Sequence, residues 1–198
     1  MEIKIDKISS PETLLKILKD MGYATFEKTK WDVNIIGIRR VPGKVNSFDD
    51  RAYLICKNDS DKLQMWSWSI TTDPGTYWLK SPGNVLGTAI LKAGQYRGTW
   101  ELGLHKGKPG LVQVKPVTVW RDSDRDSSHD LGPASSTGLY GINLHRAGKS
   151  SVLVDKWSAG CQVWAKESDY EDFYALCKKQ VKETGYKTFT YTLLEESE

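Results

Sequence analysis

The amino-acid sequence predicts a mainly β fold, a sandwich or barrel, with one helix near each end of the chain. Helical hydrophobic periodicity occurs only near the two ends, and the long stretch between them consists of β-branched and aromatic runs separated by turn residues. Strands in series with helices outside them favour a mostly antiparallel sandwich or barrel. We expect one domain over 1–198, with a helix at 9–22, a β-rich core at 33–165, and a helix with a final strand at 168–194.

The first helix is predicted by a start signal, an apolar face and a stop signal. Ser9 and Glu12 have the spacing of a capping box, and Pro11 falls in the first turn, where its missing N–H costs little. Gly22 follows the helical pattern and is the predicted stop. One face of this segment is apolar and is formed by Leu14, Leu15, Leu18 and Met21.

The second helix shows the same three signals near the other end of the chain. Ser168 and Glu171 form the expected capping-box pair, and Gly185 is the predicted stop. A last β-rich run at 188–194 follows it and is expected to pair back into the sheet. The apolar face of this helix consists of Phe173, Leu176, Cys177 and Val181.

The middle of the chain consists of β-branched and aromatic runs that alternate with turn residues. Residues 73–75, 81–84, 92–94 and 108–110 have the composition of turns. Trp66 and Trp68 are separated by one serine, so both indoles face the same side of a sheet. The predicted strands are 33–39, 51–56, 63–71, 88–92, 96–104 and 111–120.

Composition and charge exclude several classes of protein. The chain has 28 Lys and Arg against 25 Asp and Glu, a net charge of +3 that is spread along the sequence. A nucleic-acid partner is therefore not expected, because such proteins usually carry a concentrated basic face. No apolar run approaches the length that spans a membrane, and the first residues lack the pattern of a signal peptide.

Three cysteines are too few and too scattered for a disulfide framework. Cys56 lies in an apolar predicted strand and Cys177 on the apolar face of the second helix, so we expect both to be buried core residues. Cys161 differs, because it follows the small, flexible run Ser158-Ala159-Gly160. That context favours a functional thiol.

A histidine precedes Cys161 by sixteen residues. Apolar Ile142 and Leu144 alternate with polar residues in this stretch, so His145 is predicted on the polar face at the end of a strand. A cysteine nucleophile needs an imidazole that takes its proton and N–H groups that stabilise an oxyanion. The pattern therefore favours nucleophilic catalysis by Cys161 with His145 as the base.

The order and spacing of His145, Ser158, Gly160 and Cys161 resemble the catalytic motif of the YkuD-type L,D-transpeptidases. Residues 70–75 and 94–96 are similar to a weaker upstream feature of that family, so the resemblance covers about half of the chain, residues 70–164. It implies a β-rich catalytic domain that acts on peptidoglycan stem peptides without a metal or an organic cofactor.

The resemblance also implies a role for each motif residue. Cys161 attacks a carbonyl of a stem peptide, and His145 takes the thiol proton and later gives one to the leaving amine. Backbone N–H groups near Gly160 and Cys161 stabilise the oxyanion, and Ser158 orients His145. The resulting thioester is resolved by an amine, which cross-links the wall, or by water, which cleaves it.

The chain departs from the family pattern at three positions. Ala159 stands where the family often has His, Arg146 where it usually has Gly, and Val163 where it commonly has Arg or Asn. These departures concern the donor and acceptor peptides more than the fold. The candidate substrate-binding residues are Tyr140, Arg146, Trp157 and Trp164.

The chain also resembles divergent versions of this domain from phages of gut bacteria. Together with the missing signal peptide, this predicts delivery to the bacterial cell wall by a virion or at lysis, and otherwise a cytoplasmic protein. In a phage, water as the acceptor makes the enzyme a wall-degrading peptidase.

Two other classes of function remain open from the sequence. His105 or His129 could join His145 as ligands of a zinc peptidase, although no His-Glu-x-x-His spacing supports one. The same fold could also be a catalytically inactive wall-binding or virion structural module that keeps an aromatic groove.

Overall fold

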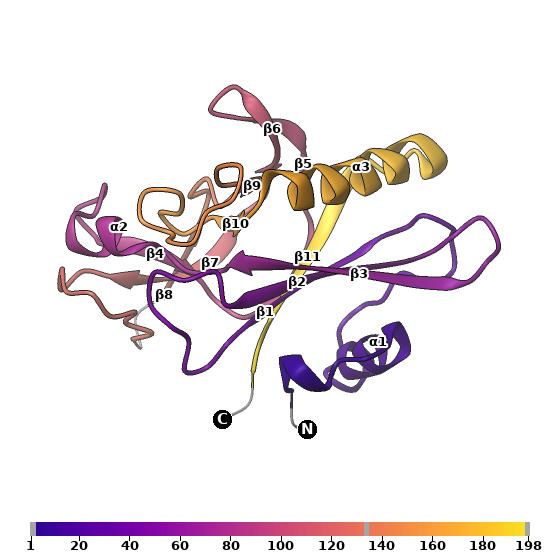
Figure 1. Ribbon diagram of the computed structural model, residues 1–198, viewed down its shortest axis with the longest axis horizontal. Coiled ribbons are helices and arrows are strands. Elements are labelled where there is room, and N and C mark those ends of the chain that lie inside the picture. Colours follow the sequence, from indigo (N-terminus) through magenta and orange to yellow (C-terminus); the bar gives the residue numbers. More distant parts are fainter. Residues whose placement is uncertain (1–2, 133–134, 197–198) are drawn as a thin grey trace.

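A computed structural model describes residues 3–132 and 135–196 and confirms the mainly β fold (Figure 1). Eight of the strands in these residues close into a barrel, and three others form a separate sheet, β4 (Thr88–Leu91), β7 (Val117–Asp122) and β8 (Ser135–Gly138). In the order of their pairing, the barrel strands are β1 (Asn34–Arg39), β11 (Thr188–Glu195), β5 (Gly94–His105), β6 (Lys108–Gln113), β9 (Leu144–Arg146), β10 (Gln162–Trp164), β3 (Leu63–Thr71) and β2 (Asp50–Lys57).

Most neighbouring strands pair antiparallel, as expected, but two pairs are parallel. The final strand, β11, lies parallel to β1, and β10 lies parallel to β9. The second pairing sets Val163 opposite His145 and so brings the residue before β10, Cys161, close to the histidine strand. A parallel pair needs a long connection, which here is the loop that carries Ser158 and Gly160.

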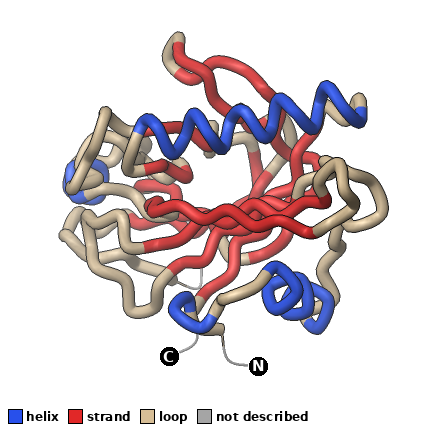
Figure 2. The backbone as a smooth tube through the Cα atoms, turned by 45° about the vertical axis from the view of Figure 1, so that its right-hand side comes forward, coloured by secondary structure: helices blue, strands red, loops and turns tan. Residues whose placement is uncertain are grey.

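Two longer helices lie on opposite sides of the barrel strands, as Figures 1 and 2 show. The helix α1 (Pro11–Asp20) packs with η1 (Ile5–Lys7) on outward-facing side chains of β1 and β2, including Ile36 and Ile55. The helix α3 (Glu167–Thr184) contributes Phe173 and Cys177 to the larger core. A short helix, α2 (Thr76–Lys80), follows β3. None of the described helices is long and apolar enough to cross a membrane.

Both predicted helix starts need correction. Ser10, not Ser9, caps α1, because its Oγ accepts a hydrogen bond from the Thr13 N–H at 3.2 Å. The helix α3 begins at Glu167 and has no side-chain cap, so the expected capping box at Ser168 is absent. The stop signal is confirmed at Gly185, which takes a left-handed conformation with φ 75°.

The strand predicted at 111–120 is two strands in two different sheets. Pro116 cannot donate to a ladder, and the chain leaves the barrel after β6 and enters the second sheet as β7. The turn before β6 is also not at 108–110. Lys106 and Gly107, with φ 49° and 77°, form a two-residue hairpin turn, and this places His105 at the end of β5. The sequence patterns also did not predict α2, β8 and β10.

The larger core lies between the barrel strands and α3. Trp66 and Trp68 both pack against it, which confirms that they share one face of β3. Cys56 and Cys177 are fully buried in it, as expected. Tyr170 ties α3 to the barrel, because its hydroxyl donates a 2.8 Å hydrogen bond to the Leu144 carbonyl, next to His145.

Candidate active site

The turn that carries Cys161 is held by Ser158 and Gly160. The Ser158 hydroxyl donates to the Cys161 carbonyl at 2.8 Å and accepts from the Gly160 N–H at 3.1 Å, while the Ser158 carbonyl accepts from the Gly75 N–H at 3.0 Å. Gly160 has φ 117°, and a Cβ there would lie 2.2 Å from the Ala89 carbonyl oxygen. Only glycine fits this position without moving the backbone.

These bonds change the expected oxyanion site. The Gly160 N–H is already donated to Ser158, so it is not free to face a substrate oxygen. The Cys161 N–H has no acceptor within the described part of the chain. Of the two predicted donors, the structure therefore leaves the Cys161 N–H free for an oxyanion.

His145 is buried and held in one tautomer. Its Nδ1 donates to the Arg146 carbonyl at 2.9 Å, so its Nε2 carries the lone pair. Nε2 is buried and has no hydrogen-bond partner among the described residues. The Arg146 carbonyl, and not Ser158, therefore orients the imidazole, which corrects the predicted role of Ser158.

The Cys161 thiol lies beside this imidazole in a dry environment. Its Sγ is 3.4 Å from the Gly141 carbonyl and accepts a weak hydrogen bond from the Asn143 N–H at 3.5 Å. Burial raises the pKa of Cys161 and lowers the pKa of His145 to about 4. The resting pair is therefore a neutral thiol and a neutral imidazole rather than a thiolate and an imidazolium.

A second histidine, His105, completes the cluster; the sequence analysis named it only as a residue that could join His145 in a metal site. The His105 ring stacks on the His145 ring with centroids 4.1 Å apart and planes 6° apart. One ring nitrogen of each histidine and the Cys161 Sγ all lie within 4.8 Å of one another. The β5–β6 hairpin brings His105 here from far away in the sequence, so the spacing of Cys161 and His145 gave no signal for it.

The cluster has the donor types of a zinc site but not its geometry. Zinc bonds to histidine along the lone pair in the ring plane at about 2.0–2.1 Å. Two parallel, stacked rings hold their lone pairs in two separate planes, so both lone pairs cannot point at one ion. One ring must turn before His105 and His145 hold the same ion. His129 does not join the cluster, because its Nε2 lies 3.1 Å from the Pro74 carbonyl.

A cavity of about 290 Å³ opens beside His145 and His105. Trp157 lines it and is 44% exposed, so its indole can cover an apolar part of a ligand. Among the described residues, no Asp or Glu lines this cavity. Four of its lining residues are cationic: Lys106, Lys108, Arg146 and Lys156.

Arg146 lines the cavity but is already engaged. Its guanidinium forms a 2.7 Å ion pair with Glu167 and donates to the Ala147 carbonyl at 3.1 Å. Lys156 lies over the Tyr77 ring at 4.4 Å. The other two cations of the cavity are Lys106 and Lys108. Within the described residues, neither forms an ion pair or lies over an aromatic ring.

The other two predicted substrate-binding residues, Tyr140 and Trp164, do not line this cavity. Tyr140 lines a separate cavity of about 300 Å³ together with Ala159, and its ring lies 4.6 Å from the Arg121 guanidinium. Trp164 is fully buried in the core and stacks on Phe173 at 4.3 Å. Trp164 is therefore a residue of the larger core and does not line a groove.

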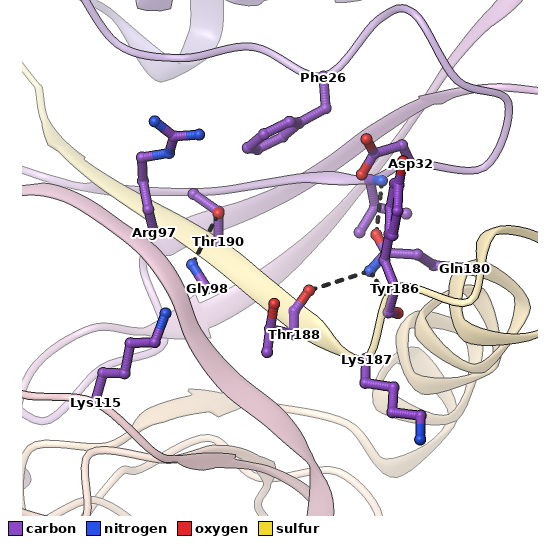
Figure 3. Close-up of a pocket in the computed structure, with 11 residues that line it drawn as sticks. Phe26, Asp32, Arg97, Gly98, Lys115, Gln180, Tyr186, Lys187, Thr188 and Thr190 are labelled. Atoms are coloured by element: carbon purple, nitrogen blue, oxygen red, sulfur yellow. Dashed lines mark hydrogen bonds between the residues drawn. The ribbon is translucent and has the colours of Figure 1, made fainter.

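Another hollow, of about 640 Å³, lies away from Cys161 (Figure 3). Figure 3 shows Arg97 and Lys115 on one side of it and Asp32 and Tyr186 on the other. Its part of β5, at Arg97, is eight residues from His105 along the strand, roughly 20 Å or more at the usual rise per residue. It contains none of the predicted site residues.

The fold and the site together define a β-barrel protein with a buried cysteine–histidine pair beside a cationic cavity. Comparisons with protein-family models, curated proteins and solved structures find no match to this chain. The resemblance to the L,D-transpeptidases therefore rests on the motif residues alone.

Proposed function

We propose that the chain is a cysteine acyl-transfer enzyme of the L,D-transpeptidase type that acts on peptidoglycan stem peptides. The observation that carries the proposal is the pairing of Cys161 with His145, whose buried Nε2 lacks a partner. Burying a polar atom without a hydrogen bond costs about 1–3 kcal/mol, and Nε2 is one of five such side-chain atoms among the described residues. A thiol proton is a natural partner for it during a reaction.

The proposed reaction starts from the neutral pair. The Cys161 sulfur attacks the substrate carbonyl while Nε2 of His145 takes the thiol proton, and the Cys161 N–H faces the oxyanion that forms. Collapse of the tetrahedral intermediate breaks the amide C–N bond, and His145 returns the proton to the leaving amine. A second amine or water then attacks the thioester while His145 accepts its proton. Collapse of this second intermediate breaks the C–S bond, and His145 returns the proton to the Cys161 sulfur.

The cavity next to His145 supports an anionic substrate. It is lined by cationic side chains, and Lys106 and Lys108 are free to meet a carboxylate. Stem peptides carry free carboxylates near the amide bonds that such an enzyme cleaves. Delivery to the wall by a virion or at lysis, with water as the acceptor, belongs to the same proposal.

A zinc hydrolase is the second candidate, because His105, His145 and Cys161 offer three ligand atoms within 4.8 Å. The stacked rings make it the weaker candidate, since one ring has to turn before both nitrogens reach one ion. The two candidates differ in their response to chelators. A zinc hydrolase loses activity with a chelator, whereas a cysteine enzyme keeps it.

The test is intact-protein mass spectrometry after incubation with purified muropeptides and with a simple activated aryl ester. We expect wild-type protein, with or without a chelator, to gain the mass of one acyl group, and the Cys161→Ala variant to gain none. An adduct that survives in Cys161→Ala contradicts the cysteine mechanism. Loss of activity with the chelator, and its return with added zinc, favours the metal candidate instead.

A further inference from the structure

We propose that His105 is a positioning residue of this site, a neutral imidazole that holds the His145 ring and stabilises its protonated form. The proposal rests on the proposed function and deepens it. It assigns a role to a residue outside the Cys–His motif, carried to the site by the β5–β6 hairpin.

The first step of the argument is the orientation of the His145 ring. The ring has one in-plane anchor, the 2.9 Å hydrogen bond from Nδ1 to the Arg146 carbonyl. A single hydrogen bond leaves the ring free to rock about the bond axis. The parallel face of His105, 4.1 Å away, opposes that rocking and so restricts the direction in which Nε2 points.

The second step is the protonation state of His105, which a chain of hydrogen bonds sets. The Gln113 N–H donates to Asn143 Oδ1 at 2.9 Å, and this fixes which end of the amide is oxygen. Asn143 Nδ2 therefore faces His105 Nδ1, at 2.9 Å, and donates to it. His105 Nδ1 is an acceptor, and its proton sits on Nε2.

The same chain opposes a second proton on His105. Protonated Nδ1 would face the Asn143 N–H as donor against donor. Nearby positive charge also disfavours protonation of His105. Among the described residues no Asp or Glu lines the shared cavity, and its charged lining residues are Lys106, Lys108, Arg146 and Lys156. Burial and Lys106 both lower the pKa of His105.

The third step is the charge that appears during acylation. When His145 takes the thiol proton it becomes a cation, and the neutral His105 ring presents its face to that cation at 4.1 Å. A cation over an aromatic face is attracted, and the attraction is stronger where water is excluded. Charge on His105 acts in the opposite direction and, in addition to burial, lowers the pKa of His145, so a protonated His105 would repel the imidazolium and oppose the transfer.

The test measures the rate at which an activated aryl ester acylates Cys161, as a function of pH. His105→Phe keeps a stacked ring and is expected to stay within about threefold of wild type, whereas His105→Ala loses about tenfold. His129→Phe, a histidine outside the cluster, is the control and is expected to leave the rate unchanged. Equal rates for His105→Ala and wild type overturn the proposal.

A double-mutant cycle tests the hydrogen-bond chain. Asn143→Asp replaces the amide with a carboxylate that favours protonated His105, so the rate falls and its acid limb moves to higher pH. In a His105→Phe background, Asn143→Asp is expected to cause no shift of the acid limb of the pH–rate profile. A shift of equal size in both backgrounds overturns the role of His105, since the carboxylate then acts on Cys161 or His145 directly.

These outcomes separate the two proposals. If wild-type Cys161 is acylated and Cys161→Ala is not, the proposed function stands, and the His105 series alone decides the positioning role. If Cys161→Ala is acylated as fast as wild type, the proposed function fails, and the role of His105 fails with it. Thermal unfolding of each variant shows whether a lost rate reflects a lost fold.

Discussion

Replacing Gly160 by alanine should damage both the stability and the chemistry of the site. A Cβ at Gly160 would lie 2.2 Å from the Ala89 carbonyl oxygen, where ordinary contacts begin at 3.4 Å, so the two backbones must separate by about 1.2 Å. The left-handed φ of 117° adds strain of about 1–3 kcal/mol. A displacement of about 1 Å in a reacting group costs about 100-fold in rate. We therefore expect acylation of Cys161 to fall about 100-fold in Gly160→Ala.

Gly185→Ala is the matched control for this prediction. Gly185 also has a positive φ, 75°, but a Cβ there meets no atom within 4 Å. Gly185→Ala should lower the free energy of unfolding by about 1 kcal/mol, because alanine is strained at the positive φ of this helix cap. It should leave the acylation rate unchanged. Urea unfolding and the aryl-ester assay measure the two effects. If both variants lose the same stability and Gly160→Ala keeps its rate, the close approach to Ala89 does not position Cys161.

Three further predictions follow from the same contacts. Because only neutral His145 accepts a proton, the acylation rate should fall as the pH drops through about 4, below the ordinary histidine pKa of 6.5, and a midpoint near 6.5 in the pH–rate profile contradicts this. Arg39→Met should destabilise the fold by about 3–5 kcal/mol in urea unfolding, because the buried guanidinium pairs with Asp73 at 2.9 Å; a loss under about 1 kcal/mol argues against that pair. Lys108→Gln should raise KM for carboxylate-bearing peptides about threefold and leave the neutral aryl ester unaffected; equal effects on both substrates argue against charge selection.

Local signals predicted the elements of the fold well, and pairing between distant strands decided the rest. Helical periodicity and the glycine stops located α1 and α3, because these signals lie within a few residues. The split of 111–120 into β6 and β7 depended on which sheet each half joins, and only Pro116 hinted at it. The hairpin turn at Lys106 depended on positive φ angles that a lysine rarely adopts.

The motif residues show the same division between local and tertiary information. The Ser158-Ala159-Gly160 turn was predictable because its hydrogen bonds run between neighbours. The stacking of His105 on His145 was not, because a hairpin that is distant in sequence provides it. Trp164 was wrongly expected in a groove, since proximity to Cys161 in sequence does not say which face of β10 points inward.

The central claim is that Cys161 is the nucleophile that becomes acylated. Peptide mapping after an acid quench tests this claim most directly. The chain provides its own controls, because Cys56 and Cys177 are fully buried and burial raises the pKa of both thiols, that of Cys56 to about 12. We predict a single acyl group on the Cys161 peptide, lost in His145→Ala. An adduct spread over all three cysteines, or none on Cys161, would contradict the account.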